Sequence, residues 1–285
     1  MRSRTPVPLR RALETQARLF FHAPRGTRRC WITLGQVKAL EVVPRNLGAQ
    51  GKVLFYIHGG GFTFGSPRTH SAMVAQLAYR LGVRAVLPQY RLAPEAPYPA
   101  APDDVYAAWR GLIETGVNPS NIVVGGDSAG GALAFGLVAH LIKRGEATPG
   151  AVFGFSPLTD LTHSGDSFRQ NAEADVMLPA EWAKDLAEMF LQGQAGDDPR
   201  ISPLQGDFRG GPPAWVTVGD TEILRDDGRR MVAHYTAQGG NATLVERHDL
   251  PHVWPIFHNI LPEARETLDQ LATWIRQQPG WASES

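Results

Sequence analysis

The chain has 285 residues, of which 28 are Lys or Arg and 28 are Asp or Glu, so its formal net charge is zero. A nucleic-acid-binding protein needs a basic face and a polybasic membrane anchor needs an excess of Lys and Arg, so we expect neither partner. The length fits a single α/β domain with a large core.

The sequence lacks paired cysteines, a membrane span and a signal peptide, and these features bear on the compartment and on cofactor use. The single Cys30 cannot form an internal disulfide, and no C-x-x-C pair is present to bind a metal or carry redox chemistry. No apolar run reaches the roughly 18 residues of a membrane span, and the arginine-rich N-terminus lacks the apolar region of a signal peptide. We therefore expect a cytoplasmic protein without a metal or a cofactor.

Strand-like and helix-like segments alternate along most of the chain. An amphipathic helix is expected through Leu9, Leu13 and Phe20. Two strands follow around Gly35, within about residues 29–44. Further strands are expected at 52–57, 84–90, 122–124, 151–155, 214–218 and 242–247, and further helices at 69–81, 103–115, 133–142, 181–191, 224–239 and 262–277.

This alternation predicts an α/β fold in one domain, residues 1–285, with a mostly parallel sheet that is covered by helices on both faces. The segment 161–203 interrupts the alternation with one helix between polar loops. We expect this segment and the N-terminal residues, about 1–28, to form a helical cap. Ligands of such sheets bind beyond the carboxyl ends of the strands, and the candidate residues below all follow strands.

The segment Gly126-Asp-Ser-Ala-Gly130 lies between a β-branched strand and a helix. A strand that turns into a helix within a few residues brings the two backbones close, so the positions two before and two after the tip favour glycine. The residue at the tip, Ser128, is expected to be strained, with its hydroxyl exposed. This spacing is typical of a nucleophile elbow and makes Ser128 the candidate nucleophile.

The segment His58-Gly-Gly-Gly-Phe62 directly follows another expected strand. Successive glycines leave backbone N–H groups uncovered, and such groups can stabilise the negative oxygen of a tetrahedral intermediate. We expect an oxyanion hole made by the amides of Gly60, Gly61 and Ala129. A phosphate loop is disfavoured because neither a Lys nor a spaced G-x-G-x-x-G accompanies the glycines. His58 is expected to anchor the loop by hydrogen bonding rather than to act as a base.

A serine nucleophile needs a base within reach. His252 lies in the loop between the last expected strand and the last helix, after Ser128 in chain order, whereas the competing His248 lies inside or at the end of that strand. A carboxylate must then orient the histidine. Asp220 and Glu222 both lie in the loop after the preceding strand, and their position alone leaves the choice open.

Together these motifs resemble the bacterial hormone-sensitive-lipase-like branch of the α/β-hydrolase esterases. The resemblance covers about residues 53–274. It rests on the segments HGGGF (58–62), YRLAPE (90–95), GDSAGG (126–131), SPLTD (156–160) and PHVW (251–254), in this order. It implies the α/β-hydrolase fold with an eight-stranded sheet and a helical cap, and a reaction that needs no metal or organic cofactor.

The resemblance also favours one of the two acids. Many relatives carry an Asp followed by Pro-Leu, with Asp-Glu-Gly downstream. Aligning residues 224–228 on that pattern places Glu222 where the catalytic Asp sits, and the most similar subgroup, which includes lactone hydrolases, carries Glu there. The expected triad is therefore Ser128, His252 and Glu222, with Asp220 as the second candidate for the acid.

The resemblance implies hydrolysis of small carboxylic esters with short to medium acyl chains, through an acyl-enzyme. Lactone or amide hydrolysis on the same triad is the alternative activity. A non-catalytic ligand-binding protein is disfavoured, because the plant hormone receptors that resemble this branch lack the working histidine that His252 supplies here.

Two further expectations concern the substrate pocket and the assembly. Trp182, Met189 and Phe190, together with Met177, either line an apolar pocket or pack on the core. A homodimer through the edge strand near 242–247 would fit the family.

Overall fold

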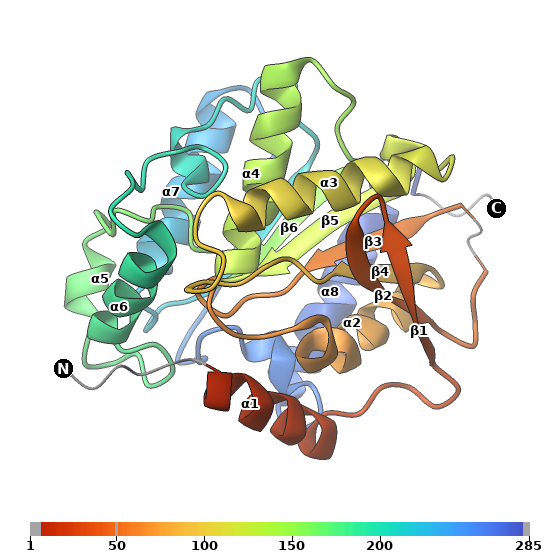
Figure 1. Ribbon diagram of the computed structural model, residues 1–285, viewed down its shortest axis with the longest axis horizontal. Helices are drawn as coiled ribbons and strands as arrows, with labels where there is room; N and C mark the ends of the chain where they lie inside the picture. Colours follow the sequence, from red (N-terminus) through yellow and green to blue (C-terminus); the bar gives the residue numbers. More distant parts are fainter. Residues whose placement is uncertain (1–6, 49–50, 282–285) are drawn as a thin grey trace.

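The computed structural model describes residues 7–48 and 51–281 and has an eight-stranded sheet at its centre (Figure 1). In spatial order the strands are β1 (Arg28–Leu34), β2 (Val37–Val43), β4 (Arg84–Pro88), β3 (Val53–Ile57), β5 (Ile122–Asp127), β6 (Ala151–Phe155), β7 (Ala214–Gly219) and β8 (Ala242–Arg247). β2 pairs antiparallel with both of its neighbours, and all the other pairs are parallel. The expectation of a mostly parallel sheet of eight strands is therefore confirmed.

Helices cover both faces of the sheet. On one face lie α3 (Ala100–Glu114), α4 (Ala129–Arg144) and α7 (Arg225–Ala237), and on the other lie α2 (Pro67–Leu81) and α8 (Pro262–Arg276) (Figure 1). The apolar side chains of the two faces form two separate clusters. Because both faces are covered, the central strands β3, β5, β6 and β7 are buried along their whole length and are nearly continuous apolar runs.

Several helices begin earlier than the sequence pattern predicts, among them α2 and α3. α2 begins at Pro67, where the hydroxyl of Ser66 caps it by accepting a backbone N–H of the first turn at 3.3 Å. α3 begins at Ala100, three residues before the start that was expected at 103. Pro102 is tolerated there because the first N–H groups of a helix have no acceptor within it. The strand expected at 84–90 ends two residues earlier, because Pro88 is the last residue of β4.

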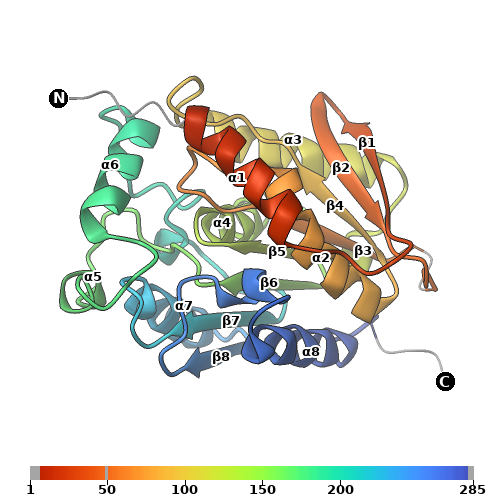
Figure 2. The ribbon, with the colours of Figure 1, turned by 90° about the horizontal axis from the view of Figure 1, so that it is seen from below.

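The segment that interrupts the alternation, residues 161–203, contains the short α5 (Ser167–Gln170) and α6 (Ala180–Leu191). The N-terminal helix α1 (Val7–Phe20) lies against α2, and Figure 2 shows α1 and α6 on the same side of the molecule. Both helices contribute walls to one cavity, whose floor is formed by the loops after β3, β5 and β8. Residues 1–6, the start of the expected N-terminal part of the cap, lie outside the described residues.

Candidate active site

Ser128 lies at the turn between β5 and α4, as the G-x-S-x-G spacing predicts. Its φ of 50° and ψ of −121° are strained for a residue other than glycine. A Cβ on Gly126 would clash with the carbonyl of Gly130, and a Cβ on Gly130 would clash with the carbonyl of Ile57. Only glycine therefore fits on either side of the turn that presents Ser128 to the cavity.

The three glycines after β3 differ in what their amides do. The Gly59 amide donates to the carboxylate of Asp127 at 3.0 Å. Gly60 and Gly61 have φ values of 114° and 55°, and their amides donate no hydrogen bond within residues 7–48 and 51–281. The amide of Ala129 is the first of α4 and so has no acceptor inside that helix. Gly60 and Gly61 line the same cavity as the nucleophile candidate.

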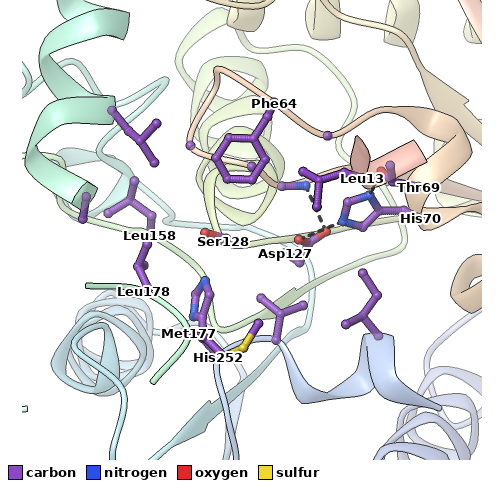
Figure 3. A pocket seen from close by; sticks show the side chains of 18 of the residues that line it. Leu13, Phe64, Thr69, His70, Asp127, Ser128, Leu158, Met177, Leu178 and His252 are labelled. Carbon is purple, nitrogen blue, oxygen red and sulfur yellow. Dashed lines mark hydrogen bonds and ion pairs between the residues drawn. The ribbon is translucent and has the colours of Figure 1, made fainter. Parts of the chain in front are cut away.

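His252 and Glu222 come from the loops after β8 and β7 and are in direct contact. His252 Nδ1 lies 2.7 Å from Glu222 Oε2, and both His252 and Ser128 line the cavity (Figure 3). Glu222 is buried, and its Oε1 accepts the Gly219 amide at 2.6 Å and the Ser156 hydroxyl at 2.7 Å. Burial alone lowers the pKa of His252, but the hydrogen bond to Glu222 and its charge raise this pKa above its ordinary value.

Asp220, the second candidate for the acid, contacts a different histidine. Its Oδ2 lies 2.7 Å from Nδ1 of His248, whose side chain is 89% exposed. Its Oδ1 accepts the Asp249 amide at 2.9 Å. The hydrogen bond to His248 lowers the pKa of Asp220. The structure therefore joins Glu222, and not Asp220, to His252.

His58 anchors the glycine loop on the side of the core. Its Nδ1 donates to the Gly59 carbonyl at 2.8 Å, and its own carbonyl accepts the Tyr90 hydroxyl at 2.8 Å. Its ring stacks on that of Tyr90, with a centroid distance of 4.3 Å. Burial lowers the pKa of His58 to about 3, so the ring is neutral. His58 is not among the residues that line the cavity, which fits an anchor better than a base.

The cavity has a volume of about 530 Å³ and mostly apolar walls (Figure 3). These walls include Leu13, Phe64, Leu158, Met177, Leu178 and Trp182. Of the two alternatives that the sequence left open, Met177 and Trp182 therefore follow the first, because they line an apolar pocket. Phe190 instead is buried and stacks on Phe62 with a centroid distance of 4.0 Å, and Met189 is not among the lining residues.

Comparison with known proteins identifies the fold family. A family model described as the alpha/beta hydrolase fold matches residues 54–256, which include the glycine loop, the elbow and His252. The chain belongs to the α/β-hydrolase family.

The relatives of this α/β-hydrolase are named as acetyl-hydrolases or esterases. It is 33% identical to an acetyl-hydrolase of Streptomyces hygroscopicus over 87% of its own length and 83% of that protein. It is 34% identical to an esterase of Acinetobacter venetianus over 94% of its own length and 88% of that protein. Its structure matches a crystal structure of an esterase of the bacterial hormone-sensitive lipase family with a TM-score of 0.92 and 35% identity, covering 98% of this chain and 93% of that one.

These comparisons confirm the resemblance to hormone-sensitive-lipase-like esterases. The α/β-hydrolase described here is a carboxylesterase, and it acts on carboxylic esters.

Three side chains around the acid of this α/β-hydrolase were not predicted from the sequence. Ser156 donates its hydroxyl to Glu222 and accepts the Val253 amide at 3.1 Å. Asn171 Nδ2 donates to the Glu222 carbonyl at 2.7 Å, and Asp175 accepts the next amide of the same loop at 2.9 Å. The SPLTD segment contributed only to the resemblance, and no local pattern indicates contacts between residues so far apart in the chain.

The described part of this α/β-hydrolase was searched for metal-binding groups and for membrane-spanning helices. No group of three or more His, Cys, Asp or Glu side chains there is placed to hold a metal ion. In the same residues, no helix is both long and apolar enough to cross a bilayer.

Proposed function

We propose that this esterase works through a triad of Ser128, His252 and Glu222 and through an acyl-enzyme. The proposal depends on one observation, the hydrogen bond of 2.7 Å between His252 Nδ1 and Glu222 Oε2 beside a cavity that Ser128 also lines. A hydroxyl, an imidazole and a carboxylate that orients the imidazole are the groups that acyl transfer to serine needs.

In the acylation half-reaction, His252 Nε2 accepts the proton of Ser128 while the serine Oγ attacks the carbonyl carbon of the ester. The carbonyl oxygen becomes negative, and the amides of Gly60, Gly61 and Ala129 donate hydrogen bonds to it. When the tetrahedral intermediate collapses, the alcohol leaves with the proton from the imidazolium. The carboxylate next to the imidazole stabilises that imidazolium and keeps the proton on Nδ1 in the neutral ring.

In the deacylation half-reaction, water takes the place of the serine hydroxyl. His252 accepts a proton from the water, which attacks the acyl carbon, and the second tetrahedral intermediate uses the same amides. The carboxylic acid then leaves, and the proton returns to Ser128. Each bond that forms or breaks in the second half mirrors one in the first.

The helical segments 7–28 and 161–203 act in this proposal as a cap over the site. Leu13 of α1 and Trp182 of α6 line the same cavity, and the Trp182 ring stacks on Phe64 of the glycine loop with a centroid distance of 5.3 Å. The cavity of about 530 Å³ lies in the range of small-ligand sites. Its limited volume and apolar walls favour esters with short to medium acyl chains.

The acyl-enzyme can be tested by partitioning between water and added methanol. Acetate esters of different alcohols form the same acetyl-enzyme, so each should give the same ratio of methyl acetate to acetate. A ratio that changes with the leaving alcohol would contradict a common intermediate.

Substrate preference is tested by a panel of p-nitrophenyl esters of increasing acyl length, with lactones and anilides of similar size. The proposal predicts that kcat/KM is highest for short to medium acyl esters. A higher kcat/KM for lactones or anilides would assign the main activity to one of the alternatives.

A further inference from the structure

Asp127 precedes the nucleophile in the chain and turns a buried carboxylate towards the glycine loop. Its Oδ1 accepts the Gly59 amide at 3.0 Å and the Tyr56 hydroxyl at 2.8 Å. Its Oδ2 lies 3.2 Å from Nε2 of His70 (Figure 3). A Cβ on Gly59 would overlap this carboxylate, so the first glycine of the loop leaves room for it. A hydrogen bond to Asp127, the residue next to the nucleophile, therefore holds the loop that carries the proposed oxyanion donors.

Both ring nitrogens of His70 face hydrogen-bond acceptors. Nε2 faces the carboxylate, while Nδ1 lies 2.8 Å from the Thr69 hydroxyl and 3.4 Å from the Ser66 carbonyl. The Thr69 hydroxyl accepts the Ser66 amide at 2.9 Å and lies 2.8 Å from the Ser66 carbonyl. When it donates its single proton to that carbonyl, its remaining lone pair can accept a hydrogen bond from the ring. A ring with an acceptor at each nitrogen is fully satisfied only as the imidazolium, which carries a proton on both.

We propose that Asp127 and His70 form a buried ion pair that positions the oxyanion loop, with the His70 imidazolium compensating the Asp127 charge beside the oxyanion. The proposal rests on the oxyanion hole assigned above. An uncompensated carboxylate close to the developing negative oxygen would raise the reaction barrier, because charges in a buried site are weakly screened. With its partner charged, the carboxylate keeps a charge-assisted hydrogen bond to Gly59, and the pair has no net charge.

The titratable side chains that face the pair from the core are neutral. The pKa values of Tyr56 and Tyr90 are raised well above their ordinary values, mainly by burial. The His58 ring stacks on His70 with a centroid distance of 5.7 Å, and its pKa of about 3 is set by burial and by the His70 charge. Burial alone lowers the pKa of His70, but the carboxylate raises it overall. On the cavity side, the other titratable lining residues are His163 and His252, and Figure 3 shows His252 beside Ser128.

A double-mutant cycle tests whether His70 compensates the charge of Asp127. The readout is the acid limb of the pH profile, the range in which kcat/KM for p-nitrophenyl acetate falls as the pH is lowered. The Asp127 charge raises the pKa of His252, and the imidazolium offsets this effect in the wild type. His70→Gln should therefore move the acid limb to higher pH, and adding Asp127→Asn should move it back. Asp160→Asn is the matched control, because Asp160 is a buried acid paired with Arg230 outside the cavity lining, and it should leave the limb in place.

Positioning of the loop is tested by Asp127→Asn alone. This change keeps the shape of the side chain but weakens the bond to Gly59, so kcat should fall about tenfold to hundredfold while KM changes little. Titration with a fluorophosphonate counts the active sites, so a loss of folded protein is not read as a loss of turnover. An unchanged kcat per active site would overturn the positioning role.

The charge of His70 can also be read without any variant, from the ¹⁵N chemical shifts of its ring in the wild-type protein at neutral pH. The proposal predicts a proton on both nitrogens. A neutral ring, or an acid limb that His70→Gln leaves at the wild-type pH, would overturn the ion pair. Failure of the fluorophosphonate to label the wild type would instead contradict the proposed function, so the two failures can be distinguished.

Discussion

His252 and Glu222 are joined by a hydrogen bond of 2.7 Å between Nδ1 and Oε2, and their side chains are only 11% and 1% exposed. A second histidine–carboxylate pair, His248 and Asp220, has the same distance of 2.7 Å in the neighbouring loops. The His248 side chain is 89% exposed, and this pair does not line the cavity. Burial and access to the cavity, rather than the length of the hydrogen bond, therefore distinguish the proposed catalytic pair.

The two acids give a matched pair of variants. Glu222→Ala should lower kcat/KM about 10³–10⁴-fold, because His252 loses the group that fixes its tautomer and stabilises its charged form. Asp220→Ala removes only an exposed pair and should change kcat/KM by less than about twofold. Steady-state hydrolysis of p-nitrophenyl acetate measures both. A larger loss in Asp220→Ala would transfer the orienting role to Asp220.

The pH dependence of kcat/KM should follow the protonation of His252. Only the neutral imidazole accepts the serine proton, so activity is lost as pH falls through the pKa of His252. Glu222 raises this pKa above its ordinary value of 6.5, and the midpoint of the acid limb should therefore lie above that pH. In Glu222→Gln the raising charge is gone but burial remains, so the limb of the residual activity should move to lower pH. A limb that stays in place would show that another group titrates.

Ser156 should act as a positioning residue for the acid. Ser156→Ala removes its hydrogen bonds to Glu222 and to the Val253 amide, and we expect an approximately tenfold loss of kcat/KM with about 1–3 kcal/mol of destabilisation. The pH profile separates this role from packing, since a displaced Glu222 would also move the acid limb.

The control for this variant is Thr217→Val, measured by thermal unfolding and by the same assay. The Thr217 hydroxyl is buried and has no hydrogen-bond partner among the described residues. Replacing it should leave activity unchanged and leave stability unchanged or higher. Wild-type activity and an unmoved acid limb in Ser156→Ala would contradict the positioning role.

Comparison of Gly61→Ala with Gly145→Ala distinguishes the effect of backbone strain on stability from the effect of an altered oxyanion hole on turnover. Their φ values are 55° and 64°, so alanine at either position should lower the free energy of unfolding by about 1–2 kcal/mol. A Cβ on Gly61 would lie 2.6 Å from Leu186 Cδ1, whereas one on Gly145 would meet nothing within 4 Å. Gly61→Ala should therefore also lower kcat about 10²-fold or more, and Gly145→Ala should not. Equal turnover of the two variants would argue against an oxyanion donor at Gly61.

The sequence was sufficient to predict those site residues that directly follow a strand. Ser128, Gly60 and His252 each follow a strand, and parallel strands share one carboxyl edge, so their convergence could be predicted. The choice between Asp220 and Glu222 could not be made this way, because two positions of one loop satisfy the same rule. It needed the family resemblance.

The contacts that support the site could not be predicted, because they are set by tertiary packing. Asp127 meets His70 across 57 residues of sequence, and Ser156 meets Glu222 across 66. No periodicity or turn signal encodes such a distance. The early start of α3 was missed for a different reason, since a proline in the first turn of a helix is compatible with helix and with loop alike.

The role of Ser128 is tested most directly by fluorophosphonate labelling and p-nitrophenyl acetate hydrolysis of the wild type and of Ser128→Ala. We expect one adduct per wild-type chain, located by mass spectrometry on the peptide that contains Ser128. In Ser128→Ala we expect no adduct and a fall in kcat of about 10⁵–10⁶-fold. An adduct on another residue, or turnover retained by Ser128→Ala, would contradict the role of Ser128 as the nucleophile.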